Sequence, residues 1–187
     1  TPMDTGRVIL NQDRFQLTLE RLCHQLIEEF DDFKDTCLIG IQPRGVFLSQ
    51  RIHARLIELL DLPSLEYGKL DITFYRDDFR MRTKPLKANT TEMPFLVEDK
   101  HVILVDDVLY SGRTVQAAMT ALTHYGRPHR VELVTLVDRR FNRHLPIQSD
   151  FTGMRVDALD EAYVKVEWKE QNGEDRVLLF PNKEEAD

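Results

Sequence analysis

The sequence has few of the residues that mark disulfide scaffolds, metal centres or membrane spans. Its only two cysteines, Cys23 and Cys37, form neither a CxxC pair nor a metal-ligand spacing. No apolar run is long enough to cross a membrane, and no signal-like segment is present. The net charge of −7 gives the chain no overall attraction for nucleic acid or membrane. These absences favour a reduced, cytoplasmic protein in which both cysteines are buried apolar residues.

The length and the periodicity of the chain predict one α/β domain spanning residues 1–187. Apolar residues recur at helical spacing over 15–30, 46–60 and 114–126. Short apolar runs, expected to be buried strands, occupy 36–41, 102–105 and 131–137. Strands that alternate with helices predict a mainly parallel sheet with helices on both faces, and such sheets bind ligands at the carboxyl ends of their strands.

Two further regions carry strand-like patterns. Leu70, Ile72 and Phe74 alternate with polar residues, which predicts a half-exposed strand. A long polar connection follows, and we expect a flexible loop at about 76–100 that acts as a lid; the alternatives are a solvated excursion or an exposed hairpin. Near the end of the chain, Asn172-Gly173 separates two strand-like runs, which predicts an antiparallel hairpin at the edge of the sheet.

The most informative segment is 102–114, where four apolar residues lead into Asp106 and Asp107 and then into a small hydroxylic turn. A helix begins at this turn, so its unpaired N–H groups and dipole favour a phosphate, assisted by Ser111, Thr114 and Arg113. The two carboxylates suit a ribose diol or a magnesium shell. An alternative is that the acids only solvate a strand end. A Walker A loop fits poorly, because that motif requires a glycine and a lysine that this segment lacks.

A second turn between a strand and a helix contains Pro43, Arg44 and Gly45. Backbone N–H groups exposed by Gly45, together with the guanidinium of Arg44, would suit a pyrophosphate. At the mouth of the long loop, Arg76 is expected on the pyrophosphate side. The loop cations Arg80, Arg82 and Lys84 are expected to close over it.

Basic residues also gather in two clusters, which we interpret mainly as solvated loop charges. A nucleic-acid patch is the alternative, although Phe141 is the one interleaved aromatic residue. The two clusters contain Arg127, His129 and Arg130, and Arg139, Arg140, Arg143 and His144.

Segment 102–114 closely resembles the phosphoribosyl pyrophosphate (PRPP) motif of type I phosphoribosyltransferases. Together with the Pro43-Arg44-Gly45 turn, the run 70–78 and the segment 138–146, it makes the chain similar to the PyrR family from about Val8 to Phe180. This family comprises bifunctional pyrimidine operon regulators and uracil phosphoribosyltransferases. The resemblance implies the type I phosphoribosyltransferase fold, with a small hood and a C-terminal β-hairpin at about 139–180.

The resemblance implies that uracil and PRPP are converted to UMP and pyrophosphate, with Mg²⁺ bound through PRPP and not directly by the protein. Purine salvage relatives carry an aspartate where Tyr110 stands, so the tyrosine favours a pyrimidine base. The implied catalytic residues are Arg44, Arg76, Asp106 and Asp107. A hood of Arg139 and the backbone near Val156 would cover uracil. The implied substrate contacts are Pro43, Arg44, Gly45, Asp106, Asp107, Val108, Leu109, Tyr110, Ser111, Gly112, Arg113, Thr114, Arg139 and Val156.

The resemblance also implies a UMP-responsive regulator that binds a pyrimidine-operon leader RNA, and a homo-oligomer, dimer or tetramer. His24 matches a position associated with RNA binding. The chain departs from the family pattern at Gln42, where a basic residue is usual, in a longer loop after Asp138, and at Asp157-Ala158-Leu159. The alternatives are an RNA-binding attenuator with little enzymatic role and a purine phosphoribosyltransferase for hypoxanthine or guanine.

Overall fold

The computed structural model describes residues 6–75 and 91–182, and its centre is a five-stranded sheet. Every pair of neighbouring strands in this sheet is parallel, as the alternation of strands and helices predicted. The strands, in spatial order, are β3 (Glu66–Leu70), β2 (Thr36–Ile41), β4 (His101–Leu109), β5 (Arg130–Arg139) and β6 (Phe151–Val156).

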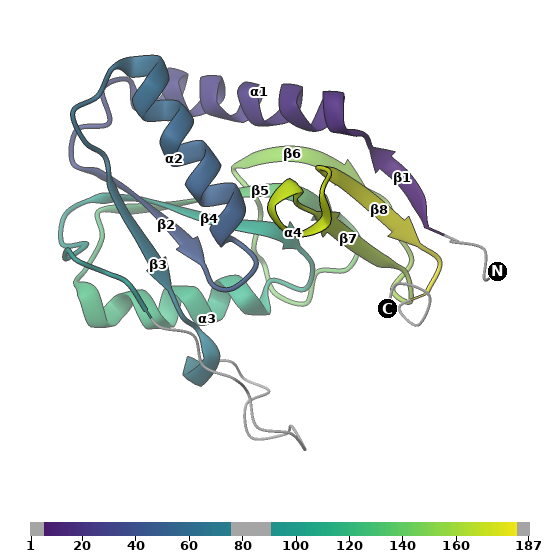
Figure 1. Ribbon diagram of the computed structural model, residues 1–187. Helices are drawn as coiled ribbons and strands as arrows, with labels where there is room; N and C mark the ends of the chain where they lie inside the picture. Colours follow the sequence, from purple (N-terminus) through teal and green to yellow (C-terminus); the bar gives the residue numbers. More distant parts are fainter. Residues whose placement is uncertain (1–5, 76–90, 183–187) are drawn as a thin grey trace.

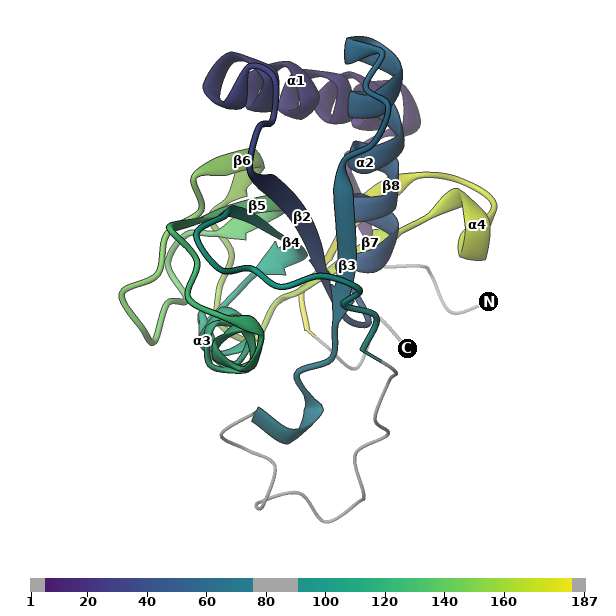
Figure 2. The same ribbon diagram turned by 90° about the vertical axis from the view of Figure 1, so that its left-hand side faces the viewer.

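Helices cover both faces of the sheet (Figures 1 and 2). The helices α1 (Gln12–Phe30) and α2 (Val46–Leu60) lie on one face, and α3 (Arg113–Leu122) lies on the other. Alternate residues of one strand therefore enter different cores: Leu38 packs below α1 and α2, whereas Ile39 packs toward α3. No helix in the described ranges is both long and apolar enough to span a membrane.

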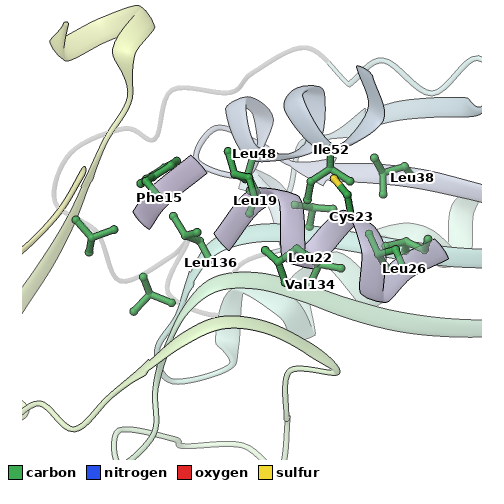
Figure 3. Packing of buried hydrophobic residues seen from close by; sticks show 14 of the residues in the cluster. Phe15, Leu19, Leu22, Cys23, Leu26, Leu38, Leu48, Ile52, Val134 and Leu136 are labelled. Atoms are coloured by element: carbon green, nitrogen blue, oxygen red, sulfur yellow. The ribbon is translucent and has the colours of Figure 1, made fainter. Parts of the chain in front are cut away.

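The larger core explains why α1 forms where the pattern predicts it. The side chain of Asn11 caps the helix by accepting a hydrogen bond from the backbone N–H of Arg14 at 3.0 Å. A stripe containing Phe15, Leu22 and Leu26 is fully buried against α2 and the sheet (Figure 3). Cys23 lies in this core, and burial raises the pKa of its thiol to about 12, as expected for an apolar cysteine.

The second cysteine lies in the other core. Cys37 of β2 is fully buried, and burial raises the pKa of its thiol to about 12 as well. Both free thiols are therefore poor nucleophiles, in agreement with their interpretation as small hydrophobic residues.

A second, antiparallel sheet lies beside the main one (Figure 1). The C-terminal strands pair as predicted, with Tyr163 opposite Phe180, but the hairpin does not edge the main sheet, whose edge strands are β3 and β6. Its connection is also longer than a two-residue turn, because a short helix, α4 (Lys169–Asn172), ends at Gly173 with φ of 81°. This sheet consists of β1 (Arg7–Leu10), β8 (Arg176–Phe180) and β7 (Tyr163–Glu167), in that order.

The predicted strand through Leu70, Ile72 and Phe74 is wrong beyond its first residue. Strand β3 ends at Leu70, and a 3₁₀ helix, η1 (Thr73–Tyr75), follows. Asp71 is buried and accepts a hydrogen bond from the hydroxyl of Thr73 at 2.7 Å, so a local side-chain contact replaces the strand ladder.

Only part of the expected loop at about 76–100 lies within the described residues. Residues 76–90 lie outside the described residues, and with them Arg76, Arg80, Arg82 and Lys84. The segment 91–100 is attached at two points: Val97 is fully buried, and Glu92 and Lys69 exchange backbone hydrogen bonds of 2.8 Å. Residues 91–100 belong to no helix or named strand, as expected of a loop, although these contacts attach them to the rest of the fold. The flexible loop and the assignment of 1–187 to one domain stay predictions.

Candidate functional site

Three strand ends that the sequence singled out lie along one edge of the sheet. Strands β2, β4 and β5 are parallel neighbours, so their carboxyl ends point the same way. The register pairs Gly40 with Val105 and Leu109 with Asp138. The turn at 42–45, the carboxylates of β4 and the end of β5 therefore meet at this edge.

The first turn connects β2 to α2 and contains a glycine whose role differs from the predicted one. The N–H of Gly45 donates to the carbonyl of Ile41 at 2.7 Å, so it is not available for a pyrophosphate. A Cβ at Gly45 would lie 2.3 Å from the carbonyl oxygen of Val105. Glycine is thus required by the close approach of β4, and the anion-binding group that this turn presents is the exposed side chain of Arg44.

Arg44 faces the carboxylates of β4. Partial loss of water around its guanidinium lowers its pKa, but the charge of Asp107, followed by the contributions of Tyr163 and Asp106, more than offsets this effect. The pKa of Arg44 is consequently raised, and the side chain is a permanent positive charge next to two acids.

The acids lie within β4 and not beyond its end. Asp106 is 5% exposed and Asp107 is 7% exposed. The carboxylate of Asp106 accepts from the N–H of Asp107 at 2.9 Å, and that of Asp107 accepts from the N–H of Val108 at 2.7 Å. The interpretation that these acids merely solvate a strand end is therefore wrong, because almost no water reaches them.

Burial sets the electrostatics of this acid pair. It raises the pKa of both carboxyl groups, and the neighbouring charge of Asp107 raises that of Asp106 further, whereas Arg44 opposes the rise at Asp107. Two buried acids side by side favour a partner that supplies hydroxyl donors or positive charge.

The second turn, Tyr110 to Gly112, connects β4 to α3. Gly112 precedes the helix with φ of 93°, a conformation that glycine adopts without strain. Its carbonyl accepts from the N–H of Gln116 at 3.0 Å, so the N–H groups of residues 113–115 precede the repeating hydrogen bonds of the helix. The hydroxyl oxygen of Ser111 accepts from the N–H of Arg113 at 3.3 Å, and Thr114 is exposed. This is the geometry of an anion site at a helix N-terminus.

Arg143 holds this turn from outside, a role that the sequence did not indicate. Its guanidinium donates to the carbonyl of Tyr110 and to the carboxylate of Asp138, both at 2.6 Å. The next residues add two more bonds, because the N–H groups of His144 and Leu145 donate to the carbonyl of Ser111 at 2.9 and 3.2 Å. The interpretation of Arg143 as a solvated loop charge is wrong.

At the far end of the site, Arg139 and Val156 lie side by side on neighbouring strands. Arg139 is 5% exposed, its guanidinium carbon lies 4.4 Å from the ring centroid of Tyr110, and burial lowers its pKa. The carbonyl of Val156 already accepts from the N–H of Arg140 at 3.2 Å. Tyr110 therefore joins the phosphate-type turn to the predicted hood.

Several other residues of the predicted basic surface are paired with acids. Arg140 binds Asp157 at 2.7 Å, and Arg130 binds Glu132 at 2.7 Å. On α1, His24 lies 3.3 Å from Glu20. A hydrogen bond from Arg55, more than the contact with His24, lowers the pKa of Glu20 to about 2. These residues form charge-balanced surfaces.

The site contains most of the residues that the sequence singled out, with Arg76 outside the described ranges. Within those ranges, no three His, Cys, Asp or Glu side chains group closely enough to hold a metal ion on their own.

Comparison with known proteins agrees with this geometry. Residues 7–171 match the family model of the phosphoribosyl transferase domain. The chain is 44% identical to the Bifunctional protein PyrR of Picosynechococcus sp. over 92% of this chain and 96% of the relative. It is 42% identical to that of Syntrophobacter fumaroxidans, over 93% and 92%.

Solved structures show the same fold at low sequence identity. A hypoxanthine phosphoribosyltransferase from Staphylococcus aureus superposes with a TM-score of 0.69 and 20% identity, covering 97% of this chain and 95% of the other. The enzyme from Trypanosoma cruzi gives 0.67 and 13%, covering 96% and 99%. The fold, the two turns around the buried acids and the sequence identity together establish that this chain belongs to the PyrR family of phosphoribosyltransferases.

Proposed function

We propose that this protein is a uracil phosphoribosyltransferase, which converts uracil and PRPP to UMP and pyrophosphate. The observation that carries the proposal is the position of Asp106 and Asp107, buried between a turn that presents Arg44 and a helix N-terminus. This arrangement supplies, in one line, a cation for pyrophosphate, acceptors for ribose hydroxyls and donors for a 5-phosphate.

Each part of PRPP has a proposed partner. Arg44, with Arg76 from the segment outside the described residues, stabilises the charge that develops on the departing pyrophosphate. Asp106 and Asp107 accept hydrogen bonds from the ribose hydroxyls. The N–H groups at the start of α3 and the hydroxyls of Ser111 and Thr114 hold the 5-phosphate. Because departure of pyrophosphate leaves positive character on the ribose, the protein acts mainly by positioning and electrostatics.

The nucleobase is proposed to be uracil, bound beside Arg139 and Val156. Uracil has carbonyl oxygens that accept hydrogen bonds, and Arg139 is a buried donor at the base end. Tyr110, whose phenol remains protonated at neutral pH, stands where purine relatives carry an aspartate. A purine phosphoribosyltransferase, the activity named for several structural neighbours, is the alternative.

The residues of the site fit a magnesium ion that arrives with PRPP. Mg²⁺ prefers hard oxygen ligands, keeps several waters and is commonly bound by one or two carboxylates together with substrate phosphates. Asp106 and Asp107 supply two carboxylates, and no larger acidic cage exists within the described residues. Bound through PRPP, with Asp106 and Asp107 accepting hydrogen bonds from the waters that it keeps, the ion would neutralise charge on the pyrophosphate.

The test is a turnover assay of the purified chain with PRPP, magnesium and each of uracil, hypoxanthine, guanine and orotate. We expect UMP and pyrophosphate from uracil, with at least tenfold lower kcat/KM for the other bases. Equal or faster turnover of hypoxanthine or guanine would establish the purine alternative, and no product from any base would refute the proposal.

UMP-responsive binding of a pyrimidine-operon leader RNA is the second activity that the family resemblance implies, and it would require a cytoplasmic protein. The charge balance of His24, Arg140 and Arg143 weakens this part of the proposal. A gel-shift titration with and without UMP tests it: a shift that strengthens with UMP supports regulation, and none up to micromolar protein refutes it. Light scattering of the same sample tests the proposed homo-oligomer, dimer or tetramer.

A further inference from the structure

A contact at the nucleobase end joins two segments that are far apart in the sequence. The phenol of Tyr110, in the turn after β4, donates a hydrogen bond to the carboxylate of Asp160. Asp160 lies in the connection between β6 and β7, which we call the hood segment (157–162). The contact therefore crosses from the phosphate turn to the hood.

Arg139 makes a second attachment of the same segment. Its Nη2 donates to the carbonyl of Leu159 at 2.9 Å, and its Nε donates to the side chain of Asn142 at 3.2 Å. The guanidinium lies over the ring of Tyr110 at 4.4 Å, within the range of a cation–π contact. Adjacent hood residues are thus held by Arg139 and by Tyr110, which also contact each other.

The arrangement fixes the direction of Nη1 of Arg139, which carries two of the five N–H donors of the guanidinium. With Nε and Nη2 engaged, Nη1 is the nitrogen that makes no hydrogen bond within the described residues. The ring of Tyr110 can rotate about its side-chain bonds unless its hydroxyl is held, and Asp160 is the group that holds it. A free Tyr110 ring would leave one face of the guanidinium without support.

We propose that Asp160 is a positioning residue for the nucleobase: by holding the phenol of Tyr110, it keeps the ring against Arg139, so that Arg139 presents Nη1 to a carbonyl oxygen of the base. This inference rests on the proposed uracil phosphoribosyltransferase activity and extends it to a residue that takes no part in PRPP binding. Asp160 directly follows Asp157-Ala158-Leu159, where the chain departs from the family pattern.

The experiment compares steady-state kinetics of Asp160→Ala, Tyr110→Phe and the double variant. Because the hydrogen bond is exposed to water, we expect each single variant to raise KM for uracil by only about fivefold. In Asp160→Ala, whose side chain takes no part in PRPP binding, the KM for PRPP and kcat should stay within twofold of wild type. The double variant should match either single variant, because both changes remove the same contact. Asp160→Glu, which keeps a carboxylate, should restore part of the lost affinity.

A matched control is Asp157→Ala, which removes a carboxylate of the same hood segment. Asp157 pairs with Arg140 and is about half exposed, but it does not contact Tyr110. We expect its KM for uracil to equal that of the wild type. An equal rise in this control would mean that the hood is merely loosened, and it would overturn the role of Asp160.

The remaining outcomes separate this inference from the proposed function. An active wild type with unchanged KM for uracil in Asp160→Ala, or with additive effects in the double variant, overturns the inference alone. UMP binding measured by calorimetry on the same proteins decides the case if a variant is too slow to assay. A wild-type protein that neither forms nor binds UMP overturns the proposed function, and the inference with it.

Discussion

The two turns of the site each place a glycine at the start of a helix, but for different physical reasons. Gly45 has an ordinary φ of −82°, and it is required because a Cβ would lie 2.3 Å from a backbone oxygen of β4. Gly112 has φ of 93°, while the nearest atoms to a Cβ there lie at an ordinary 3.4 Å. The first position requires glycine because a side chain would not fit, and the second because the backbone adopts a positive φ.

This difference decides how each turn handles an anion. The turn at Gly45 is closed by its own backbone, since the N–H of Gly45 is bonded to Ile41, and it therefore presents a side-chain charge, Arg44. The turn at Gly112 presents backbone donors and is held from outside by Arg143. We therefore expect the first turn to bind a phosphate group through a side-chain charge and the second through backbone dipoles.

The largest effect is expected at the charged turn. Arg44→Ala should lower kcat/KM by about 10²–10³-fold, because no backbone donor of that turn replaces the lost charge. Arg44→Lys should recover part of the loss, since it restores charge without the planar donor fork. Steady-state kinetics with uracil and PRPP measure both, and circular dichroism checks the fold. Wild-type rates in Arg44→Ala would show that the first turn does not act through the charge of Arg44.

The two glycines can be compared directly through stability. Gly45→Ala should cost about 3 kcal/mol or more in the free energy of unfolding, because it forces backbone atoms apart, as overpacking does. Gly112→Ala should cost only about 1–2 kcal/mol, the price of a left-handed conformation. Urea denaturation measures both.

Gly173 is the control for this pair, because it has φ of 81° and no atom within 4 Å of a Cβ. Gly173→Ala should match Gly112→Ala in the free energy of unfolding. A smaller loss for Gly45→Ala than for either would contradict the assignment of crowding to the first turn.

A smaller kinetic effect is expected where the second turn is anchored. Arg143→Ala should raise KM for PRPP by about tenfold, a change of about 1.4 kcal/mol, with little change in kcat, because the phosphate turn is less well positioned. It should also lower stability by about 3 kcal/mol, because it leaves the buried Asp138 unpaired. Arg140→Ala, which removes a surface pair with Asp157, should change neither. An unchanged KM in Arg143→Ala would show that the turn holds its shape alone.

The smallest effect concerns the acids between the turns. Burial raises the pKa of Asp106, so the folded protein favours the protonated carboxyl more strongly than the unfolded chain does. The stability that this group contributes is therefore full below the unfolded pKa of about 3.9, and it is lost as the pH rises through the folded pKa. Asp106→Asn mimics the protonated acid and should raise Tm at neutral pH while activity falls. The gain should vanish near pH 3.5, and thermal melts across pH measure it. A lower Tm of Asp106→Asn at pH 7 would contradict the inference that burial of the charged Asp106 carboxylate destabilises the folded protein.

The sequence predicted those parts of the fold that depend on local patterns. The cap at Asn11, the helices α1 and α2 and the buried strand β2 follow from residue spacing, and they were found at the expected positions. The strand β4 was also found, but it continues past the expected end at Val105 to Leu109 and so includes both acids. The strand β6 was missed, because a glycine in the middle of its six residues interrupts the alternation of apolar and polar residues. The Asn-Gly signal indicated the correct pairing of strands but not the sheet to which they belong.

The sequence by itself determined that a phosphate-type turn follows a strand with two acids, because that motif is contiguous and its residues act within one turn of chain. Only the tertiary structure decided why Gly45 is a glycine, what Arg143 holds and which acid meets Tyr110. These contacts join residues 33 to 60 positions apart, and such contacts leave no periodic trace in the sequence. The pieces of the site are local, whereas their alignment depends on the packing of the whole sheet.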